Sequence, residues 1–200
     1  GRLEAASYWP VDISGEALTQ AASRLAGENP ALAVTAVQLD FTAAHGVAPL
    51  LAHLPTMVRR LVYYPGSSIG NASPAEAIGL LKAFRALAGE DGGLLIGFDL
   101  KKDPARLNAA YNDAAGVTAA FNRNLLVRLN RELGADFSPG MFAHHAFYNA
   151  EQGRIEMHLV SLARQRVKVA GMTVEFEAGE SLHTENSYKY TPQEFQALAA

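Results

Sequence analysis

The 200-residue sequence contains 49% hydrophobic residues, which is enough apolar material for a globular core. It carries 17 Lys and Arg against 20 Asp and Glu, and this formal net charge of −3 gives no electrostatic reason to expect nucleic acid or an anionic membrane as a partner. Because the chain has no cysteine, no apolar run near the ~20 residues that span a bilayer and no signal-peptide pattern, we expect a soluble cytoplasmic protein.

The first half of the chain predicts strands that alternate with helices. Helices are expected to begin after the N-cap residue Ser14, to cover about 42–56, and to begin again at the capping box Ser73-Pro74-Ala75-Glu76. Strands are expected in ASYWPVDIS (6–14), ALAVTAVQLDF (31–41), VRRLVYYPG (58–66) and GLLIGFDL (93–100). The second strand is apolar throughout, which is typical of burial on both faces. Strands separated by helices of this length predict βαβ units and a parallel sheet.

The second half predicts helices followed by antiparallel hairpins. One helix is expected from Asp103-Pro104 to about Ala115, and a longer one from about Thr118 to Leu133. The hairpins pair AHHAFYN with RIEMHLVSL and RQRVKVA with MTVEFEA. Apolar and polar residues alternate in RIEMHLVSL, so we expect one face of that strand to face solvent.

A second capping box, Thr191-Pro192-Gln193-Glu194, predicts a helix at the C-terminus. The whole pattern predicts an α/β core made of residues 1–101 and 189–200. An α+β subdomain, residues 102–188, interrupts this core.

Acidic residues end two of the predicted parallel strands. Asp12 ends the first, where a carboxylate can accept hydrogen bonds from both hydroxyls of a ribose. Asp40 and Phe41 end the second, offering an acceptor for an exocyclic amine and an aromatic face for a purine. The structural alternatives are a helix cap for Asp12 and a turn residue for Asp40. An acid at two successive strand ends favours a nucleoside pocket.

The segment Gly66-Ser67-Ser68-Ile69-Gly70 fits the G-x-S-x-G pattern of a hydrolase nucleophile elbow. An elbow needs a helix directly after the serine, whereas the capping box places the helix start at Ser73. Asn71 suggests another chemistry, because its amide can donate to a carboxylate and accept from an ammonium group. Gly66 and Gly70 would let a small polar ligand approach the backbone.

The histidines do not predict a metal site. His144 and His145 are adjacent in a strand and point to opposite faces. His183 and Glu185 are expected to share a face, but no third ligand is evident in the sequence. We therefore expect solvated or hydrogen-bonded histidines and no bound metal.

Six segments together resemble the L-histidine Nα-methyltransferases of ergothioneine biosynthesis. They are YWPVDIS, YYPGSSIGN, DPARLNAAYNDAAGVTAAFNRNLL, LNRELGADF, RIEMHLVS and GESLHTENSYKYTPQEF, and the resemblance covers essentially the whole chain. It implies a Rossmann-like class I methyltransferase core with an inserted α+β substrate-binding subdomain, and S-adenosylmethionine as cofactor. It also implies three successive methyl transfers to the α-amine of L-histidine, giving hercynine.

The resemblance assigns a binding role to ten residues and names no general base. Asp12 corresponds to the ribose-binding acid, and Asp40 with Phe41 to the adenine contacts. Asn71 and Tyr111 correspond to the carboxylate-binding pair, with Gly66 close by. The remaining substrate residues lie around the imidazole ring: Met157, Glu185, Asn186 and Ser187.

The family extends beyond this chain at both ends. Its first strand and glycine-rich turn would precede Gly1, and that strand lies in the middle of the family's sheet. We therefore expect a fragment, or a chain completed by a second polypeptide, that is inactive alone. The alternatives left open are a methyltransferase of another amino acid or aromatic amine, a serine hydrolase that uses Ser68, and a non-catalytic binding module.

Overall fold

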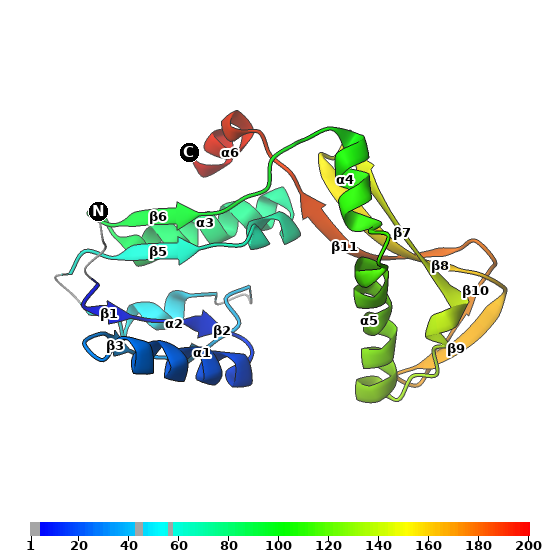
Figure 1. Cartoon of the computed structure of the whole chain (residues 1–200), viewed down its shortest axis with the longest axis horizontal. Helices are drawn as coiled ribbons and strands as arrows, with labels where there is room; N and C mark the ends of the chain where they lie inside the picture. The colour runs from blue at the N-terminus through cyan, green and yellow to red at the C-terminus, as the bar shows by residue number, and fades with distance from the viewer. Residues whose placement is uncertain (1–4, 43–45, 56–57) are drawn as a thin grey trace. The chain divides into compact units, whose positions relative to one another are not determined.

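The computed structural model of the chain describes residues 5–42, 46–55 and 58–200 (Figure 1). Helices and strands are mixed along the whole chain, as the sequence predicts for an α/β protein. The chain divides into two compact units. Unit 1 comprises Gly1–Tyr63 and Ile78–Leu95, and unit 2 comprises Tyr64–Ala77 and Ile96–Ala200. The division into domains 1–101 plus 189–200 and 102–188 stays a prediction.

Unit 1 contains short parallel strand pairs. Strand β1 (Ser7–Tyr8) pairs with β3 (Ala33–Val34), and β2 (Val11–Asp12) pairs with β4 (Val37–Gln38), both in parallel. The strands expected at 6–14 and 31–41 are thus each split into two pieces. Pro10 separates β1 from β2 because it has no N–H, although its carbonyl still accepts from Val37 at 2.9 Å.

The prediction that residues 31–41 are buried on both faces is wrong, because none of them is fully buried. Helix α1 (Gly15–Glu28) packs on these strands, contacting β2, β3 and β4. Its N-cap is Ser14 as predicted, with Oγ accepting from the Ala17 amide at 3.3 Å. A pair of strands covered by one helix leaves apolar side chains partly in solvent.

The rest of unit 1 follows the predicted order with shorter elements. Part of the helix expected at 42–56 lies outside the described residues, and the described part contains α2 (Ala48–Leu51). Strands β5 (Leu61–Tyr64) and β6 (Gly93–Ile96) pair with each other. Helix α3 (Pro74–Ala88) begins at the predicted capping box, where the Ser73 amide donates to Glu76 at 2.7 Å.

Unit 2 is built on a three-stranded antiparallel sheet in the order β11-β8-β7. These strands are β7 (Phe142–Asn149), β8 (Arg154–Ser161) and β11 (Ser181–Tyr188). A second hairpin pairs β9 (Gln165–Val169) with β10 (Met172–Phe176). Both predicted hairpins are confirmed. The sequence had not predicted β11 as the third strand, which runs beside β8 in Figure 1.

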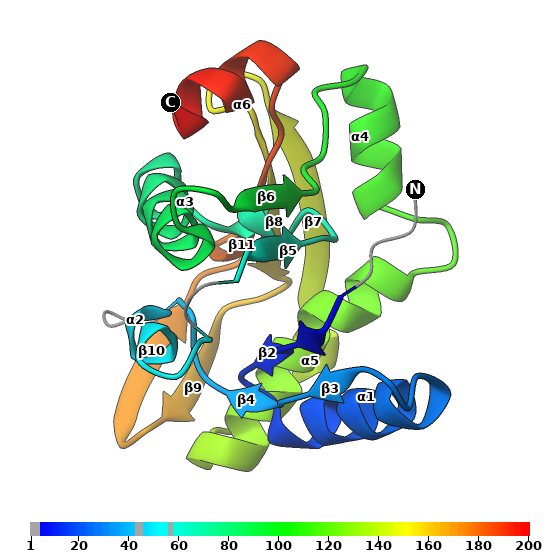
Figure 2. The same ribbon diagram turned by 90° about the vertical axis from the view of Figure 1, so that its left-hand side faces the viewer.

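Helices cover one face of this sheet (Figure 2). They are α4 (Pro104–Tyr111) and α5 (Val117–Leu133). Unit 2 also contains the 3₁₀ turns η1 (Ser68–Asn71) and η2 (Pro139–Met141) and the helix α6 (Pro192–Ala199). Helix α6 begins at the predicted Thr191 capping box. Helix α4 ends at Tyr111, earlier than predicted. The side-chain amide of Asn112 donates to the carbonyls of Asn108 and Ala146, both at 2.8 Å, and so ties the end of the helix to β7. None of the described helices is long and apolar enough to cross a membrane.

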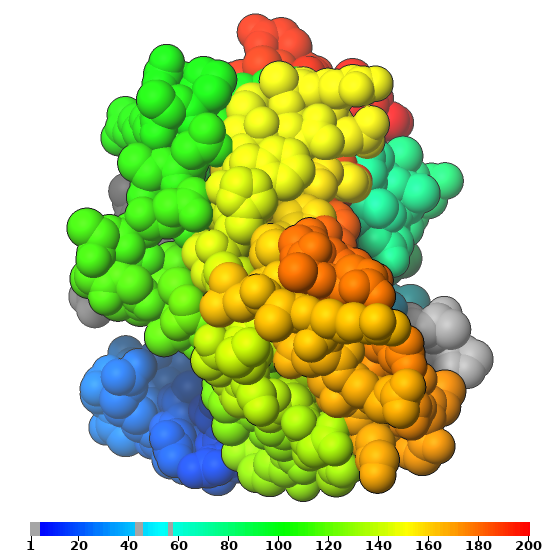
Figure 3. Space-filling model, turned by 90° about the vertical axis from the view of Figure 1, so that its right-hand side faces the viewer, coloured from blue at the N-terminus to red at the C-terminus, as the bar shows by residue number. Residues whose placement is uncertain are grey.

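Two apolar clusters anchor the helices to the sheet. The larger one lies under α5 and includes Leu126, Phe142 and Phe176, and Figure 3 shows the β9–β10 hairpin in orange beside the light-green α5. A smaller cluster lies under α4 and joins Leu107 to Met157.

The opposite face of β8 is not the solvent face that its alternating pattern predicted. Glu156 is only 7% exposed. Its Oε1 pairs with Arg154 at 2.8 Å and accepts from the Asn149 amide at 3.0 Å, so neighbouring polar groups replace water.

Replacing Asp113 with Asn is expected to lower stability at neutral pH and to flatten its acid dependence. The Asp113 carboxylate accepts from the amides of Val117 and Thr118, both at 2.8 Å, at the start of α5. Hydrogen bonds with Thr118 lower the pKa of Asp113 to about 2. A lowered folded-state pKa stabilises the protein above the unfolded value of about 3.9, and this contribution disappears as the pH falls towards 2.

Thermal melts of wild type and Asp113→Asn between pH 7 and pH 2 measure this effect. The two melting temperatures are expected to converge as the pH falls. A constant difference across that range would contradict the assignment. Asp91→Asn, which changes an exposed turn residue, is the control. Asp136→Asn is unsuitable for this purpose because Asp136 accepts from the Lys168 backbone amide.

Candidate functional site

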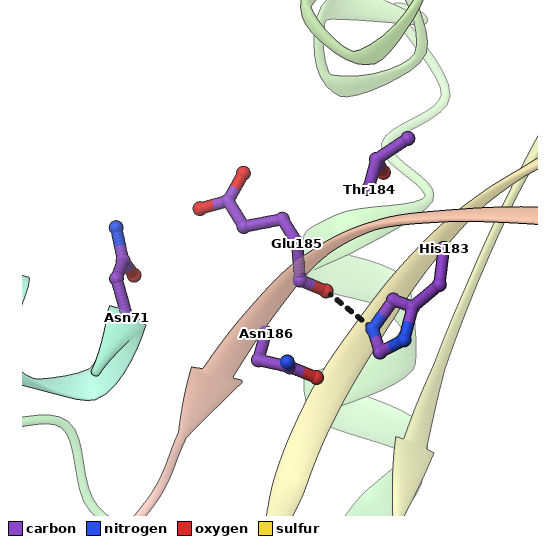
Figure 4. Close-up of a pocket in the computed structure, with 5 residues that line it drawn as sticks. All are labelled: Asn71, His183, Thr184, Glu185 and Asn186. Carbon is purple, nitrogen blue, oxygen red and sulfur yellow. Dashed lines mark hydrogen bonds between the residues drawn. The ribbon is translucent and has the colours of Figure 1, made fainter. Parts of the chain in front are cut away.

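A pocket in unit 2 lies between η1 and β11. It has a volume of about 290 Å³ and is lined by Asn71, His183, Thr184, Glu185 and Asn186. Figure 4 shows the Asn71 amide and the Glu185 carboxylate pointing into the same space from the two elements. Three of the predicted substrate residues, Asn71, Glu185 and Asn186, are therefore brought together.

The loop before the pocket places Asn71 by a close backbone contact. Gly66 and Ser67 both adopt left-handed conformations, with φ values of 78° and 62°, and this turns the chain after β5. Ile69 is fully buried, and a β-carbon at Gly70 would lie 2.7 Å from the Tyr188 carbonyl oxygen. Gly66 does not line the pocket. In this structure it forms part of the turn after β5 that leads to Asn71.

A β-bulge in β11 decides which side chains face the pocket. His183 pairs with His158, but Glu185 pairs with Met157, so the register shifts by one residue between them. Thr184 occupies the bulge, with Oγ1 donating to the Met157 carbonyl at 2.9 Å. Because 157 and 158 point to opposite faces of β8, the prediction that His183 and Glu185 share a face is wrong.

Glu185 is half-buried and lies in an environment that opposes its charge. Burial raises the pKa of the Glu185 carboxyl, and the positive charge of Lys189 offsets only part of that effect. Met157 pairs with Glu185 across the sheet and is 3% exposed, packed against α4. Met157 is not among the residues that line the pocket, and its role beside the substrate stays a prediction.

Tyr111 and Ser187, two further predicted substrate residues, meet at a buried lysine. The Tyr111 hydroxyl donates to Ser187 Oγ at 3.0 Å. Lys189 Nζ donates to the same Tyr111 oxygen at 2.9 Å and to Ser187 Oγ at 2.8 Å. The sequence analysis missed Lys189, although its position two residues after Ser187 in an aromatic run was the available signal.

Asp99 provides the negative charge that Lys189 requires. Its Oδ2 lies 3.2 Å from Lys189 Nζ, and its Oδ1 accepts from Lys102. Burial alone would raise the pKa of Asp99, but the hydrogen bonds from Lys102 and Lys189 outweigh burial and lower it. Asp99 is therefore an anion in an ion-paired network.

Three potential metal ligands lie close together on β8 and β11, and one of them, His183, also lines the pocket. Ligand atoms of Glu156, His158 and His183 all lie within 4.8 Å of one another, and Glu185 is not part of this cluster. The expectation of no bound metal stays a prediction. The His158 and His183 rings are stacked at 4.5 Å, and the Glu156 carboxylate is paired with Arg154. Arg154 would compete with any cation for that carboxylate.

The geometry around Ser68 does not form a hydrolase elbow. The left-handed residue is Ser67, not Ser68, and α3 begins at Pro74 as the sequence predicted. His144 is also engaged elsewhere, because Nε2 contacts the Tyr111 carbonyl at 2.8 Å and Nδ1 contacts the Asn122 amide at 3.0 Å. A serine nucleophile is not supported.

The predicted cofactor residues lie in unit 1. Asp12 ends β2 and is exposed, and its Oδ1 accepts from the Ser14 amide at 2.8 Å. Asp40 and Phe41 follow β4, where Asp40 Oδ1 accepts from the Thr42 amide at 2.9 Å. Since β2 and β4 are parallel neighbours, these acids lie at the carboxyl ends of paired strands. Asp40 serves the turn role that was its structural alternative, whereas Ser14, and not Asp12, is the N-cap of α1.

The sequence model of one family, described as histidine-specific, SAM-dependent methyltransferase, matches residues 2–200. The chain is 42% identical over 195 residues to the Histidine N-alpha-methyltransferase of Mycolicibacterium smegmatis, covering 96% of this chain and 59% of that protein. It is also 42% identical over 188 residues to the Histidine N-alpha-methyltransferase of Mycobacterium tuberculosis, covering 93% and 57%.

A more distant relative is the Ergothioneine biosynthesis protein 1 of Neurospora crassa. The two are 33% identical over 144 residues, which is 70% of this chain and 16% of that protein. The chain thus spans less than three-fifths of the length of each of these relatives. The match along its whole described length places the chain in the family of histidine-specific, SAM-dependent methyltransferases.

Proposed function

We propose that the protein transfers methyl groups from S-adenosylmethionine to the α-amine of L-histidine, giving hercynine for ergothioneine biosynthesis. The observation that carries this proposal is the pocket in which Asn71 and Glu185 face each other across η1 and β11, in a chain of this family. A free amino acid with a polar side chain needs recognition at both ends, and the two residue types supply it.

The residues of unit 2 suit the polar groups of histidine. Asn71 carries both a donor and an acceptor for the amino-acid end, and Tyr111, whose hydroxyl is held between Lys189 and Ser187, is the second residue of the proposed carboxylate-binding pair. Glu185 can accept from an imidazole N–H, a charge-assisted bond that a neutral acceptor would not match. Ser187 and Asn186 follow on the same strand, and Met157 supplies an apolar wall. Gly66 acts through the loop that carries Asn71.

The cofactor-binding residues of unit 1 fit an adenosine group. Among the described residues, Asp12 uses Oδ1 for the Ser14 amide, and Oδ2 remains available for ribose hydroxyls. Asp40 and Phe41 lie at the end of the neighbouring parallel strand, the edge at which such sheets bind nucleotides. S-adenosylmethionine, when bound, supplies an electrophilic methyl group.

The remaining requirement is alignment of a neutral amine. An in-line displacement depends mainly on the orientation of the nucleophile, so binding residues can carry most of the catalysis. Asn71 holds the amino-acid end through uncharged hydrogen bonds and leaves the amine lone pair free. We assign no general base.

We also propose that the strands of unit 1 belong to a Rossmann-like core that takes a further strand from outside these 200 residues or from a second polypeptide. The sheets β1–β3, β2–β4 and β5–β6 have two strands each. Large side chains on these strands are exposed: Tyr8 (39%), Leu61 (49%), Tyr63 (58%) and Leu95 (53%). Open edges with apolar faces favour an additional strand.

A methyl-transfer assay of the full-length gene product with labelled S-adenosylmethionine tests the proposed function. Label is expected in histidine and in no other proteinogenic amino acid. Label in another amino acid or an aromatic amine would assign the activity to a different substrate. The absence of transfer to every amino acid and amine would overturn the proposal in favour of a binding module.

Asp12→Asn is expected to weaken S-adenosylmethionine binding by about 10- to 100-fold, because a charge-assisted hydrogen bond to ribose is replaced by a neutral one. Calorimetric titration of the full-length protein measures the dissociation constant. Asp91→Asn, which changes an exposed acid of the turn after α3, is the matched control and is expected to leave binding unchanged. Equal affinities of wild type and Asp12→Asn would contradict the ribose assignment.

A further inference from the structure

Lys189 is a buried cation with each of its donors engaged. Its side chain is 1% exposed. Nζ contacts the Tyr111 hydroxyl at 2.9 Å, Ser187 Oγ at 2.8 Å and Asp99 Oδ2 at 3.2 Å. An ammonium group has three N–H donors, so the three contacts match its capacity. Lysine is almost never fully buried unless it is paired, and this one holds two hydroxyls of the candidate site.

The backbone fixes Lys189 from both sides. Its amide donates to the Gly153 carbonyl at 2.9 Å, and the next amide, of Tyr190, donates to the Asp99 carbonyl at 3.1 Å. Asp99 in turn is held by Lys102. Nζ also lies 4.9 Å from the centre of the Tyr111 ring, over its face. The ammonium therefore has little freedom to leave the two hydroxyls.

These contacts determine which way the Ser187 hydroxyl can act. Its oxygen accepts from both Lys189 and Tyr111, so both lone pairs are used. The hydroxyl hydrogen must then be donated to a third group. Ser187 is thereby set as a donor towards any ligand that approaches it. The Tyr111 O–H is used on Ser187, while the Tyr111 oxygen accepts from Lys189.

We propose that Lys189 is a positioning residue that, together with the Tyr111 hydroxyl, sets Ser187 as a hydrogen-bond donor and so makes the site selective for a neutral imidazole ring. A neutral imidazole has one nitrogen lone pair and one N–H. Ser187 supplies the donor for the lone pair, and Glu185, two residues earlier on the same side of β11, supplies the acceptor for the N–H. This inference rests on the proposed function.

Lys189→Met in the full-length gene product tests the role. The KM for L-histidine is expected to rise about 10-fold, with kcat changed by less than about 3-fold and the KM for S-adenosylmethionine unchanged, because the hydroxyls lose their fixed orientation. Lys101→Met is the matched control. Lys101 pairs with Glu194 at the surface, where the two side chains are 32% and 46% exposed, and its loss is expected to leave all three constants unchanged.

A double-mutant cycle separates positioning from general stability. If Lys189 acts through Ser187, Lys189→Met combined with Ser187→Ala raises the KM for histidine no more than the larger single change. Additive losses would overturn the inference, as would a wild-type KM in Lys189→Met. Thermal melts of each variant report stability separately.

Ser187→Ala also provides a test that does not require Lys189→Met to fold. It is expected to raise the KM for histidine about 10-fold, because the donor to the ring nitrogen is lost. An unchanged KM in Ser187→Ala overturns the inference. Failure of the wild-type protein to methylate histidine would instead overturn the proposed function.

Discussion

Glu185→Gln is expected to lower kcat/KM for L-histidine by about 10- to 100-fold, since a hydrogen bond to a charged acceptor contributes roughly 1.5–3 kcal/mol. Glutamine keeps the size of the side chain and the half-buried position of Figure 4 but removes the charge. Steady-state kinetics with histidine varied at saturating S-adenosylmethionine measure the change. An unchanged kcat/KM would remove Glu185 from the substrate site.

The pH dependence of histidine affinity provides a second test of the role assigned to Glu185. Because burial raises the pKa of Glu185, its carboxylate is protonated at a higher pH than an ordinary glutamate. Histidine affinity of the wild type is therefore expected to fall as the pH is lowered through that raised pKa, and Glu185→Gln is expected to lack this step. Glu151→Gln, in the exposed turn between β7 and β8, is the control and is expected to behave as wild type.

Phe142→Ala is expected to destabilise the protein by about 3–5 kcal/mol, the usual cost of removing a buried phenylalanine. Phe142 is 1% exposed, and its ring meets Phe176 edge-to-face at 5.3 Å in the cluster under α5. Urea unfolding of the full-length protein, followed by circular dichroism, measures the free energy of unfolding.

Phe121→Ala is the matched control for this core substitution. Phe121 lies on the outer side of α5 and is 65% exposed, so its loss is expected to change the free energy of unfolding by less than about 0.5 kcal/mol. Similar losses for both variants would mean that the cluster under α5 does not carry the stability of unit 2.

Elements defined by local signals were predictable from the sequence. The capping boxes at Ser73 and Thr191 place the starts of α3 and α6, because both partners of each box lie within four residues. Asp103 caps α4 and Gly134 ends α5 for the same reason. The two hairpins follow from strand patterns separated by short turns.

Features that depend on contacts distant in sequence were not predictable. The bulge at Thr184 moves Glu185 to the opposite face from His183, and nothing in the local pattern announces the extra residue. Glu156 on the polar face of β8 is buried because Arg154 on the same strand and Asn149 on β7 both contact its carboxylate. Lys189 reads as a surface residue until Asp99 is brought beside it by the parallel bridge between Leu100 and Tyr190.

The candidate site residues show the same difference between what local sequence signals predict and what distant contacts decide. Asn71 and Glu185 could be named from residue type and resemblance, but only the fold shows that η1 and β11 share a pocket. For Asp12 and Asp40, strand order predicted the shared sheet edge, and the parallel pairing of β2 with β4 confirms it. Their roles towards a cofactor stay predictions.

The close approach of Gly70 to the Tyr188 carbonyl has a consequence for substrate range. The separation between η1 and β11 depends on a backbone position that carries only hydrogen, since a β-carbon would lie 2.7 Å from that oxygen. Any larger residue at position 70 would have to push η1 away from β11, and Asn71, the next residue, would move with it. The reach of Asn71 into the pocket therefore depends on a glycine that touches no ligand.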